Sequence, residues 1–215
     1  MKMKSPTLLA ALVVVLAFFS TALALEPIEL PKPLTEGGKP LMRTLKDRKS
    51  SRSFSSRRLH PQILSNLLWA ANGINRPGEG KRTAPSAMNQ QPIDVYVALP
   101  EGLYVYDAKN HRLLPVAAKD LRAMTGTQGY VRDAPVNLVY VADLSRVGAR
   151  TAGDKDFYAA VNTGFISENV YLFCASEGLA TVVRRAIDIP ALSLEMELRP
   201  EQKIILAQSV GHPKE

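Results

Sequence analysis

Cysteine is nearly absent from this chain: Cys174 is the only one among 215 residues, so no disulfide can form within the chain. One Cys and three His residues also provide no ordinary zinc-binding set. The chain is not poor in apolar residues, since 46% of the residues are hydrophobic, which excludes a disordered protein. It has only 13 Gly and no glycine repeat, which excludes a collagen-like protein. Length and apolar content therefore predict one globular domain with its own hydrophobic core.

The short motifs of common hydrolases and nucleotide-binding enzymes are missing as well. The chain has no Gly-x-Ser-x-Gly, no His-Glu-x-x-His and no Gly-x-Gly-x-x-Gly before a helix. It also lacks a helix-turn-helix, a zinc finger and a basic sheet interleaved with aromatic residues, so we expect no nucleic-acid partner. The formal net charge of +7 permits an anionic ligand but does not identify one.

The N-terminus has the three parts of a secretory signal peptide. Lys2 and Lys4 come first, an apolar run extends from Leu8 to Phe19, and Ala22-Leu23-Ala24 resembles a cleavage site. The apolar run is too short for a comfortable membrane span, and no second candidate follows. We expect cleavage of residues 1–24 after Ala24, which predicts an exported protein, periplasmic or secreted, with no stable membrane anchor.

The remaining chain predicts an extended arm, residues 25–40, followed by a single domain, residues 41–215. The arm is rich in Pro and Gly. Helices and strands occur in the domain without regular alternation, which is typical of the α+β class. The patterns predict a short helix from Leu41, a helix from Pro61 to Asn72, a loop over 76–85, strands over 93–98, 103–106 and 111–116, a buried central strand over 136–142, a long, mostly buried helix over 154–178, a strand over 181–183, a helix over 190–198 and a final strand over 203–210.

Two polar clusters could bind a ligand. Arg48-Lys49-Ser50-Ser51-Arg52-Ser53 places three cations and three hydroxyls within six residues, a set that can surround a phosphate. Taken alone, this pattern more often marks a solvated basic turn. Residues 83–92 contain small residues that would let a flat ring approach the backbone. Taken alone, this pattern more often marks a helix cap at Ser86 followed by a turn. Gly164, inside the long helix, predicts close packing against another backbone.

Several segments, in this order, resemble the nitroreductase family of FMN-dependent proteins, which includes the peptide-azoline dehydrogenases of the thiazole/oxazole type. The similarity extends from Leu41 to Pro213. The segments that carry it are Arg48-Lys49-Ser50-Ser51-Arg52, residues 67–76, residues 82–92, residues 164–172, residues 177–183 and Val210-Gly211-His212-Pro213.

The resemblance implies a nitroreductase-like α+β homodimer, with a central, mostly antiparallel sheet and two FMN sites at the subunit interface. The long helix would form the dimer core. The residues implied to contact FMN are Arg48, Lys49, Ser50 and Arg52 at the phosphate and ribityl chain, Pro85, Ser86, Ala87 and Asn89 of the other subunit at the flavin ring, Arg184, Arg185 and Ala186 near flavin N5, and Lys214 as a further phosphate-side cation.

The resemblance also implies an oxidoreductase in which FMN passes electrons to a small aromatic, nitro or quinone-like acceptor. The cofactor carries such chemistry, so no catalytic residue of the protein is expected. Many relatives have Glu-Gly where this chain has Arg185-Ala186, and a cation there predicts a relatively high reduction potential. Export would leave NAD(P)H scarce, so another redox carrier is expected as donor. The alternatives are a flavin-free binding module of the same fold, an oxidase of peptide heterocycles and a basic surface-binding protein.

Overall fold

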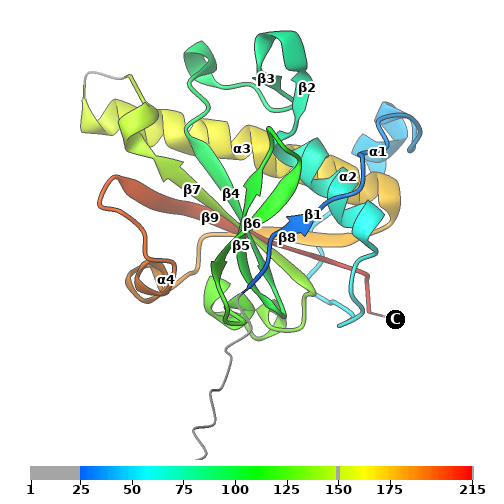
Figure 1. Ribbon diagram of the computed structural model, residues 1–215. Helices are drawn as coiled ribbons and strands as arrows, with labels where there is room; N and C mark the ends of the chain where they lie inside the picture. Colours follow the sequence, from blue (N-terminus) through cyan, green and yellow to red (C-terminus); the bar gives the residue numbers. More distant parts are fainter. Residues whose placement is uncertain (1–24, 149–150, 215) are drawn as a thin grey trace, which may run out of the picture.

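A seven-stranded sheet forms the centre of the protein in this computed structural model, which describes residues 25–148 and 151–214 (Figure 1). Its strand order is β1-β6-β5-β4-β7-β9-β8, and every adjacent pair in it is antiparallel. The strands of this sheet are β1 (Ile28–Glu29), β4 (Ile93–Leu99), β5 (Gly102–Asp107), β6 (Arg112–Ala117), β7 (Val136–Asp143), β8 (Ala180–Arg184) and β9 (Gln202–Gly211). The helices are α1 (Leu41–Asp47), α2 (Pro61–Asn72), α3 (Ala152–Glu177) and α4 (Ile189–Glu195). The predicted α+β class and antiparallel sheet are therefore confirmed.

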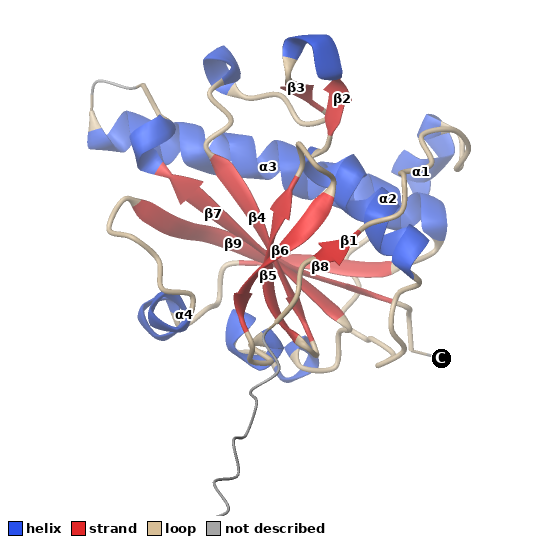
Figure 2. Cartoon of the chain, in the orientation of Figure 1, coloured by secondary structure: helices blue, strands red, loops and turns tan. Residues whose placement is uncertain are grey.

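Helices cover both faces of the sheet (Figure 2). Alternate residues of β7 point to opposite sides, as the pleat of a strand requires. Leu138 and Tyr140 belong to the core beneath α2 and α3, whereas Val139 and Val141 pack with Leu192 of α4 in a second cluster. Because both faces are buried, β7 shows the continuous apolar run that predicted a central strand.

Local signals set the ends of the two longer helices. Thr151 caps α3 by accepting a hydrogen bond from the Asp154 backbone N–H at 3.1 Å, and Gly178 ends the helix in the left-handed conformation (φ 70°). His60 caps α2 in front of Pro61 by accepting a hydrogen bond from the Gln62 backbone N–H at 3.2 Å. Within the described residues, none of the helices combines the length and the apolar character needed to cross a membrane.

The prediction of a loop over residues 76–85 is wrong in part. It contains a small antiparallel ladder between β2 (Ile74–Arg76) and β3 (Lys81–Arg82), joined by a turn in which Gly80 has φ 63°. Arg82 holds the ladder in place by donating to the Asn72 carbonyl at 2.9 Å and to Gln91 Oε1 at 2.7 Å. Polar contacts of one side chain, rather than a hydrophobic pattern, stabilise this ladder, so periodicity did not reveal it.

His111, in the turn between β5 and β6, connects several parts of the chain through hydrogen bonds. It is only partly exposed, with Nε2 2.7 Å from Ser65 Oγ and Nδ1 2.8 Å from Tyr106 OH. Ser65 in turn donates to the Pro31 carbonyl at 2.6 Å. This chain of bonds fastens the arm, which includes β1, to α2 and to the β5–β6 hairpin. The predicted signal peptide, residues 1–24, lies outside the described residues.

Candidate functional site

The basic segment 48–52 lies along β8, which is an edge strand of the sheet. The Ser51 backbone N–H donates to the Thr181 carbonyl at 2.8 Å. A few residues further on, Phe54 forms a β-bridge with Pro213, near the C-terminal end of the described chain. An edge strand has unpaired backbone groups, and this pairing covers part of them. Three segments that are distant in sequence therefore meet at one edge: 48–54, β8 and residues 212–214.

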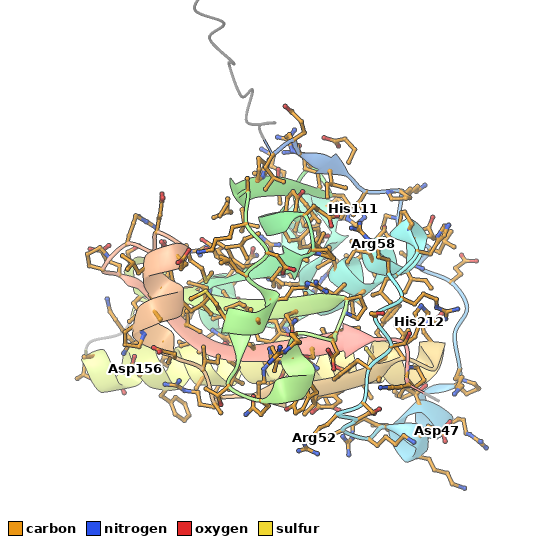
Figure 3. The ribbon with its side chains drawn as sticks, turned by 90° about the horizontal axis from the view of Figure 1, so that it is seen from below. Asp47, Arg52, Arg58, His111, Asp156 and His212 are labelled. Atoms are coloured by element: carbon orange, nitrogen blue, oxygen red, sulfur yellow. The ribbon has the colours of Figure 1, made fainter. Side chains whose placement is uncertain are left out.

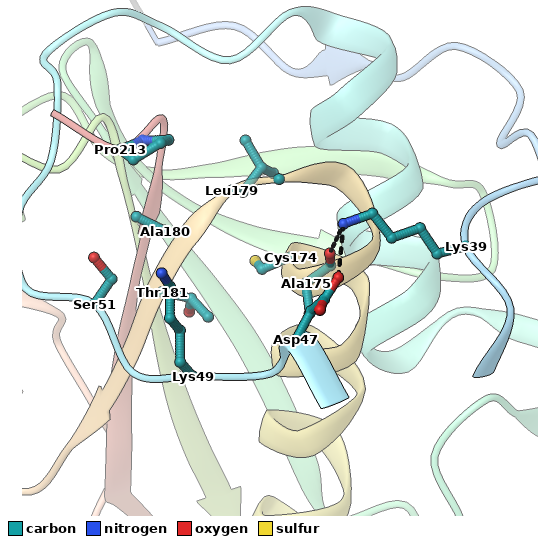
Figure 4. Close-up of a pocket in the computed structure, with 11 residues that line it drawn as sticks. Lys39, Asp47, Lys49, Ser51, Cys174, Ala175, Leu179, Ala180, Thr181 and Pro213 are labelled. Carbon is teal, nitrogen blue, oxygen red and sulfur yellow. Dashed lines mark hydrogen bonds and ion pairs between the residues drawn. The ribbon is translucent and has the colours of Figure 1, made fainter. Parts of the chain in front are cut away.

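The side chains of the basic segment are divided between its two sides. Arg48 lies over the Tyr171 ring, 5.4 Å from guanidinium carbon to ring centroid, and Ser50 Oγ is 2.8 Å from Tyr171 OH. Lys49 and Ser51 instead line a cavity of about 490 Å³ (Figure 4). The structure thus brings Arg48 and Ser50 together on one side and places Lys49 on the other. Arg52 is exposed (Figure 3).

Tyr171 is a residue of the candidate site that the sequence interpretation missed, because nothing in the pattern separates it from the other buried residues of the long helix. Its hydroxyl oxygen accepts a hydrogen bond from the Val183 backbone N–H at 3.0 Å. In the contact between the Tyr171 and Ser50 hydroxyl groups either oxygen can be the donor, because both hydroxyl hydrogens can rotate. In this way α3, β8 and the basic segment are joined at a single hydroxyl group.

Cations gather on the other side of the segment as well. In the 490 Å³ cavity, Lys39 Nζ contacts Asp47 at 3.2 Å and donates to the Ala175 carbonyl at 3.1 Å (Figure 4). Hydrogen bonds from Arg43 and Lys39 hold the pKa of Asp47 below its ordinary value. A neighbouring cavity of about 590 Å³ is lined by, among others, Arg57, His212 and Lys214, so Lys214 does lie near the basic segment.

The three consecutive residues Arg184, Arg185 and Ala186 have different environments. Arg184 is buried, and it donates to Thr125 Oγ1 at 2.7 Å, to Asn137 Oδ1 at 2.9 Å and to Ser209 Oγ at 2.9 Å. Desolvation lowers the pKa of Arg184 to about 10. Arg185 and Ala186 are exposed, and the Ala186 carbonyl accepts from the Thr127 backbone N–H at 3.1 Å.

The segment around residues 125–128 is a second feature that the sequence interpretation missed. Thr125 and Thr127 contact Arg184 and Ala186 respectively, so this segment fixes the end of β8 from the side. The Nε atom of Arg184 is buried without a hydrogen-bond partner among the described residues, and so is Gln128 Oε1. No periodic or motif signal in the sequence distinguishes residues 125–128.

The second predicted cluster, Pro85, Ser86, Ala87 and Asn89, lies elsewhere in the chain. It forms a partly exposed turn above the N-terminal half of α3, whereas segment 48–52 is on the side of α1 and the C-terminus (Figure 1). Ser86 makes no side-chain cap but accepts from the Gln91 backbone N–H at 3.0 Å. Met88, Asn89 and Gln91 have φ values of 51°, 55° and 47°, a strained backbone of the kind that occurs at binding sites. One chain alone does not bring the two clusters together.

The family model of the nitroreductases matches residues 45–212, which includes the basic segment, β8 and the end of β9. The chain belongs to the nitroreductase family. The resemblance stated from the sequence is therefore confirmed, and the membership supports a general oxidoreductase of the flavin type.

Similarity to individual proteins supports this assignment. The chain is similar to a nitroreductase of Ralstonia eutropha JMP134 of known structure, with 44% identity, a TM-score of 0.84 and coverage of 88% of this chain and 90% of the other. It is also 32% identical over 146 residues to the nitroreductase MJ1384 of Methanocaldococcus jannaschii, covering 63% of this chain and 73% of that protein. A chain of the Escherichia coli microcin synthetase McbBCD complex shares the fold, at 18% identity, with a TM-score of 0.68 and coverage of 96% and 85%.

Proposed function

We propose that the protein is an FMN-dependent oxidoreductase that passes electrons to a small aromatic, nitro or quinone-like acceptor. The observation that carries the proposal is the row of Arg48, Ser50 and Arg52 beside β8, in which neither Arg is paired with a carboxylate among the described residues. Guanidinium and hydroxyl donors of this kind suit a phosphate group. When bound, FMN supplies the electron-transfer chemistry that the protein's own side chains cannot perform.

The residues present fit this cofactor. Arg48, Ser50 and Arg52 would hold the phosphate and ribityl chain, and Lys214 would add a further cation from the neighbouring cavity. On β8, the outward-facing backbone groups of Thr181 and Val183 are bonded to Ser51 and Tyr171, and by alternation the next outward N–H belongs to Arg185. That N–H is the donor we assign to the flavin ring. Lys49 faces the 490 Å³ cavity, so its contribution to FMN binding would be indirect.

We further propose that the active form is a homodimer built on α3. Residues at positions 157, 160, 161, 164, 165 and 168 form one stripe of this helix, and all except the half-buried Val161 are exposed. Phe157 is 63% exposed and Phe165 43% exposed, although both are large and apolar. Within one chain, Gly164 packs against no other backbone, because an added Cβ would meet nothing within 4 Å. A partner helix would supply both the missing packing and the cover for the aromatic residues.

The dimer would also complete the cofactor site. Pro85, Ser86, Ala87 and Asn89 are too far from segment 48–52 in one chain to share a ligand with it, so they would contact the flavin bound by the partner. The side chain of Asn89 already accepts from Gln91 Nε2 at 2.8 Å, and its own amide protons remain available for ring heteroatoms. Phe165→Lys should yield a monomer in sedimentation equilibrium. The matched control Leu194→Lys, at an exposed Leu on α4, should remain dimeric.

Export is part of the same proposal. With residues 1–24 acting as a signal peptide, the protein would work outside the cytoplasm and receive electrons from a redox carrier or small quinol rather than from NAD(P)H. Fractionation of cells that produce the full chain tests the location. Enzyme-like rates of reduction by NADH or NADPH would contradict the expected donor.

Flavin absorbance of the purified protein tests the central proposal. Protein that carries FMN, and loses it when Arg48 and Arg52 are both changed to Gln, supports the phosphate row. Lys109→Gln/Arg132→Gln removes the same charge from exposed positions elsewhere and should keep the cofactor. Colourless wild-type protein that cannot be reconstituted would instead indicate a flavin-free binding module.

A further inference from the structure

A separate cavity of about 310 Å³ lies beside Arg185, and we name it the Arg185 cavity. Its walls are Ile189 at the start of α4 and Ile204 and Ile205 of β9. Its charged residues are Arg185, Asp156 of α3 and Lys203 of β9; Asp156 is labelled in Figure 3, on the α3 helix near α4. Apolar residues therefore line a small hollow that also has charged residues among its lining.

The charges of the Arg185 cavity do not cancel. Lys203 Nζ lies 2.7 Å from Asp156 Oδ1 and 2.9 Å from Oδ2, so these two residues neutralise each other. Arg185 has no ion pair and no side-chain hydrogen bond with any described residue, although its backbone neighbours on both sides are fixed. The cavity thus has one uncompensated cation next to an apolar wall.

We infer that the Arg185 cavity binds the electron acceptor and selects acceptors that join a small aromatic ring to a carboxylate or sulfonate group. A guanidinium group can form two parallel hydrogen bonds with such an anion, and the apolar part of the cavity lining would contact the ring. A volume of about 310 Å³ accommodates one ring with its substituents. This inference rests on the proposed function, because the cavity adjoins the Arg185 backbone N–H that we assigned to the flavin.

The test compares two ligands of almost equal shape, 4-nitrobenzoate and 4-nitrobenzamide, which differ by one negative charge. Their dissociation constants are measured by isothermal titration calorimetry with the purified protein. We expect the carboxylate to bind about fivefold more tightly than the amide, the size of effect given by one exposed ion pair. The preference should shrink at high salt, because screening weakens contacts between exposed charges.

Four variants assign the preference to Arg185. Arg185→Gln should abolish it, and Arg185→Lys should retain part of it. Asp156→Asn should increase it, because Lys203 then loses its internal partner. Lys109→Gln removes the same charge at an exposed turn between β5 and β6 and should leave the preference unchanged.

Equal affinity of the wild-type protein for the two ligands, no binding of either at millimolar concentration, or a preference that persists in Arg185→Gln would each overturn the inference. The last result would mean that a cation other than Arg185 carries the preference. FMN content is measured separately by absorbance on the same samples. Failure to bind FMN would contradict the proposed function, whereas loss of the anion preference in protein that retains FMN contradicts only the acceptor inference.

Discussion

Removing a single oxygen atom from Tyr171 tests how the candidate site is held together. The Tyr171 hydroxyl contacts both Ser50 Oγ and the Val183 backbone N–H, at 2.8 Å and 3.0 Å. Tyr171→Phe removes both hydrogen bonds but keeps the aromatic ring under Arg48. The substitution therefore separates the contribution of the hydroxyl from that of the ring.

The two lost hydrogen bonds differ in how much they contribute to the free energy of unfolding. A typical intramolecular hydrogen bond contributes about 1 kcal/mol to stability. Ser50 is exposed and can bond to water instead, so most of the loss comes from Val183, which is partly buried. We expect the free energy of unfolding to fall by about 1 kcal/mol, which lowers Tm by about 2–4 °C in a domain of this size. In the proposed cofactor site, FMN affinity should fall about fivefold as well, because the Ser50 hydroxyl loses the partner that holds it in place.

Tyr158→Phe is the matched control on the same helix, because its hydroxyl makes no hydrogen bond with a described residue. Differential scanning calorimetry and FMN titration of the two variants give both quantities. Equal melting temperatures for Tyr171→Phe and Tyr158→Phe would refute the structural role of the hydroxyl. Reduced stability with unchanged FMN affinity would refute its role in orienting Ser50.

Three further predictions concern other parts of the fold. Burial lowers the pKa of His111 below its ordinary value of 6.5, so the unfolded chain binds this proton at a higher pH than the folded chain does. The free energy of unfolding should therefore decrease as the pH falls below about 6.5. Thermal melts of His111→Asn should show a weaker dependence on pH. An added Cβ at Gly126 would meet Arg184 Nε and Gln128 Oε1, so Gly126→Ala should lower the free energy of unfolding by about 1–3 kcal/mol in urea titrations. The control Gly129→Ala should leave the free energy of unfolding unchanged, because its Cβ would meet nothing within 4 Å. Gly164→Ala should weaken the proposed dimer in sedimentation equilibrium; if α3 has no partner, the same change should instead raise stability by about 1 kcal/mol, as Ala does in an exposed helix.

Hydrophobic patterns predicted most of the fold, since every strand of the large sheet except the two-residue β1 and each of the four helices appears where a pattern indicated one. Patterns work there because β4, β7 and α2 bury apolar side chains at regular intervals. The β2–β3 ladder and the position of His111 were not predictable in this way. Both depend on polar contacts between different segments, such as the contact of Ser65 with His111. A single sequence does not indicate which of its polar residues contact each other.

The candidate site shows why a cluster of residues in sequence is not yet a site in space. In an extended segment, neighbouring side chains point in opposite directions, so a run of polar residues divides into two sets. Arg48 and Ser50 face Tyr171 while Lys49 and Ser51 face the 490 Å³ cavity. The same alternation buries Arg184 against Ser209 on one face of the sheet and leaves Arg185 exposed beside another cavity. The sequence interpretation treated each run as one group and attributed the effect of a cation near the flavin to Arg185 alone. Arg184 carries a buried charge that no described carboxylate neutralises, and it lies on the opposite side of the same strand end. Both arginines therefore contribute to the electrostatic potential at a ligand bound near the end of β8.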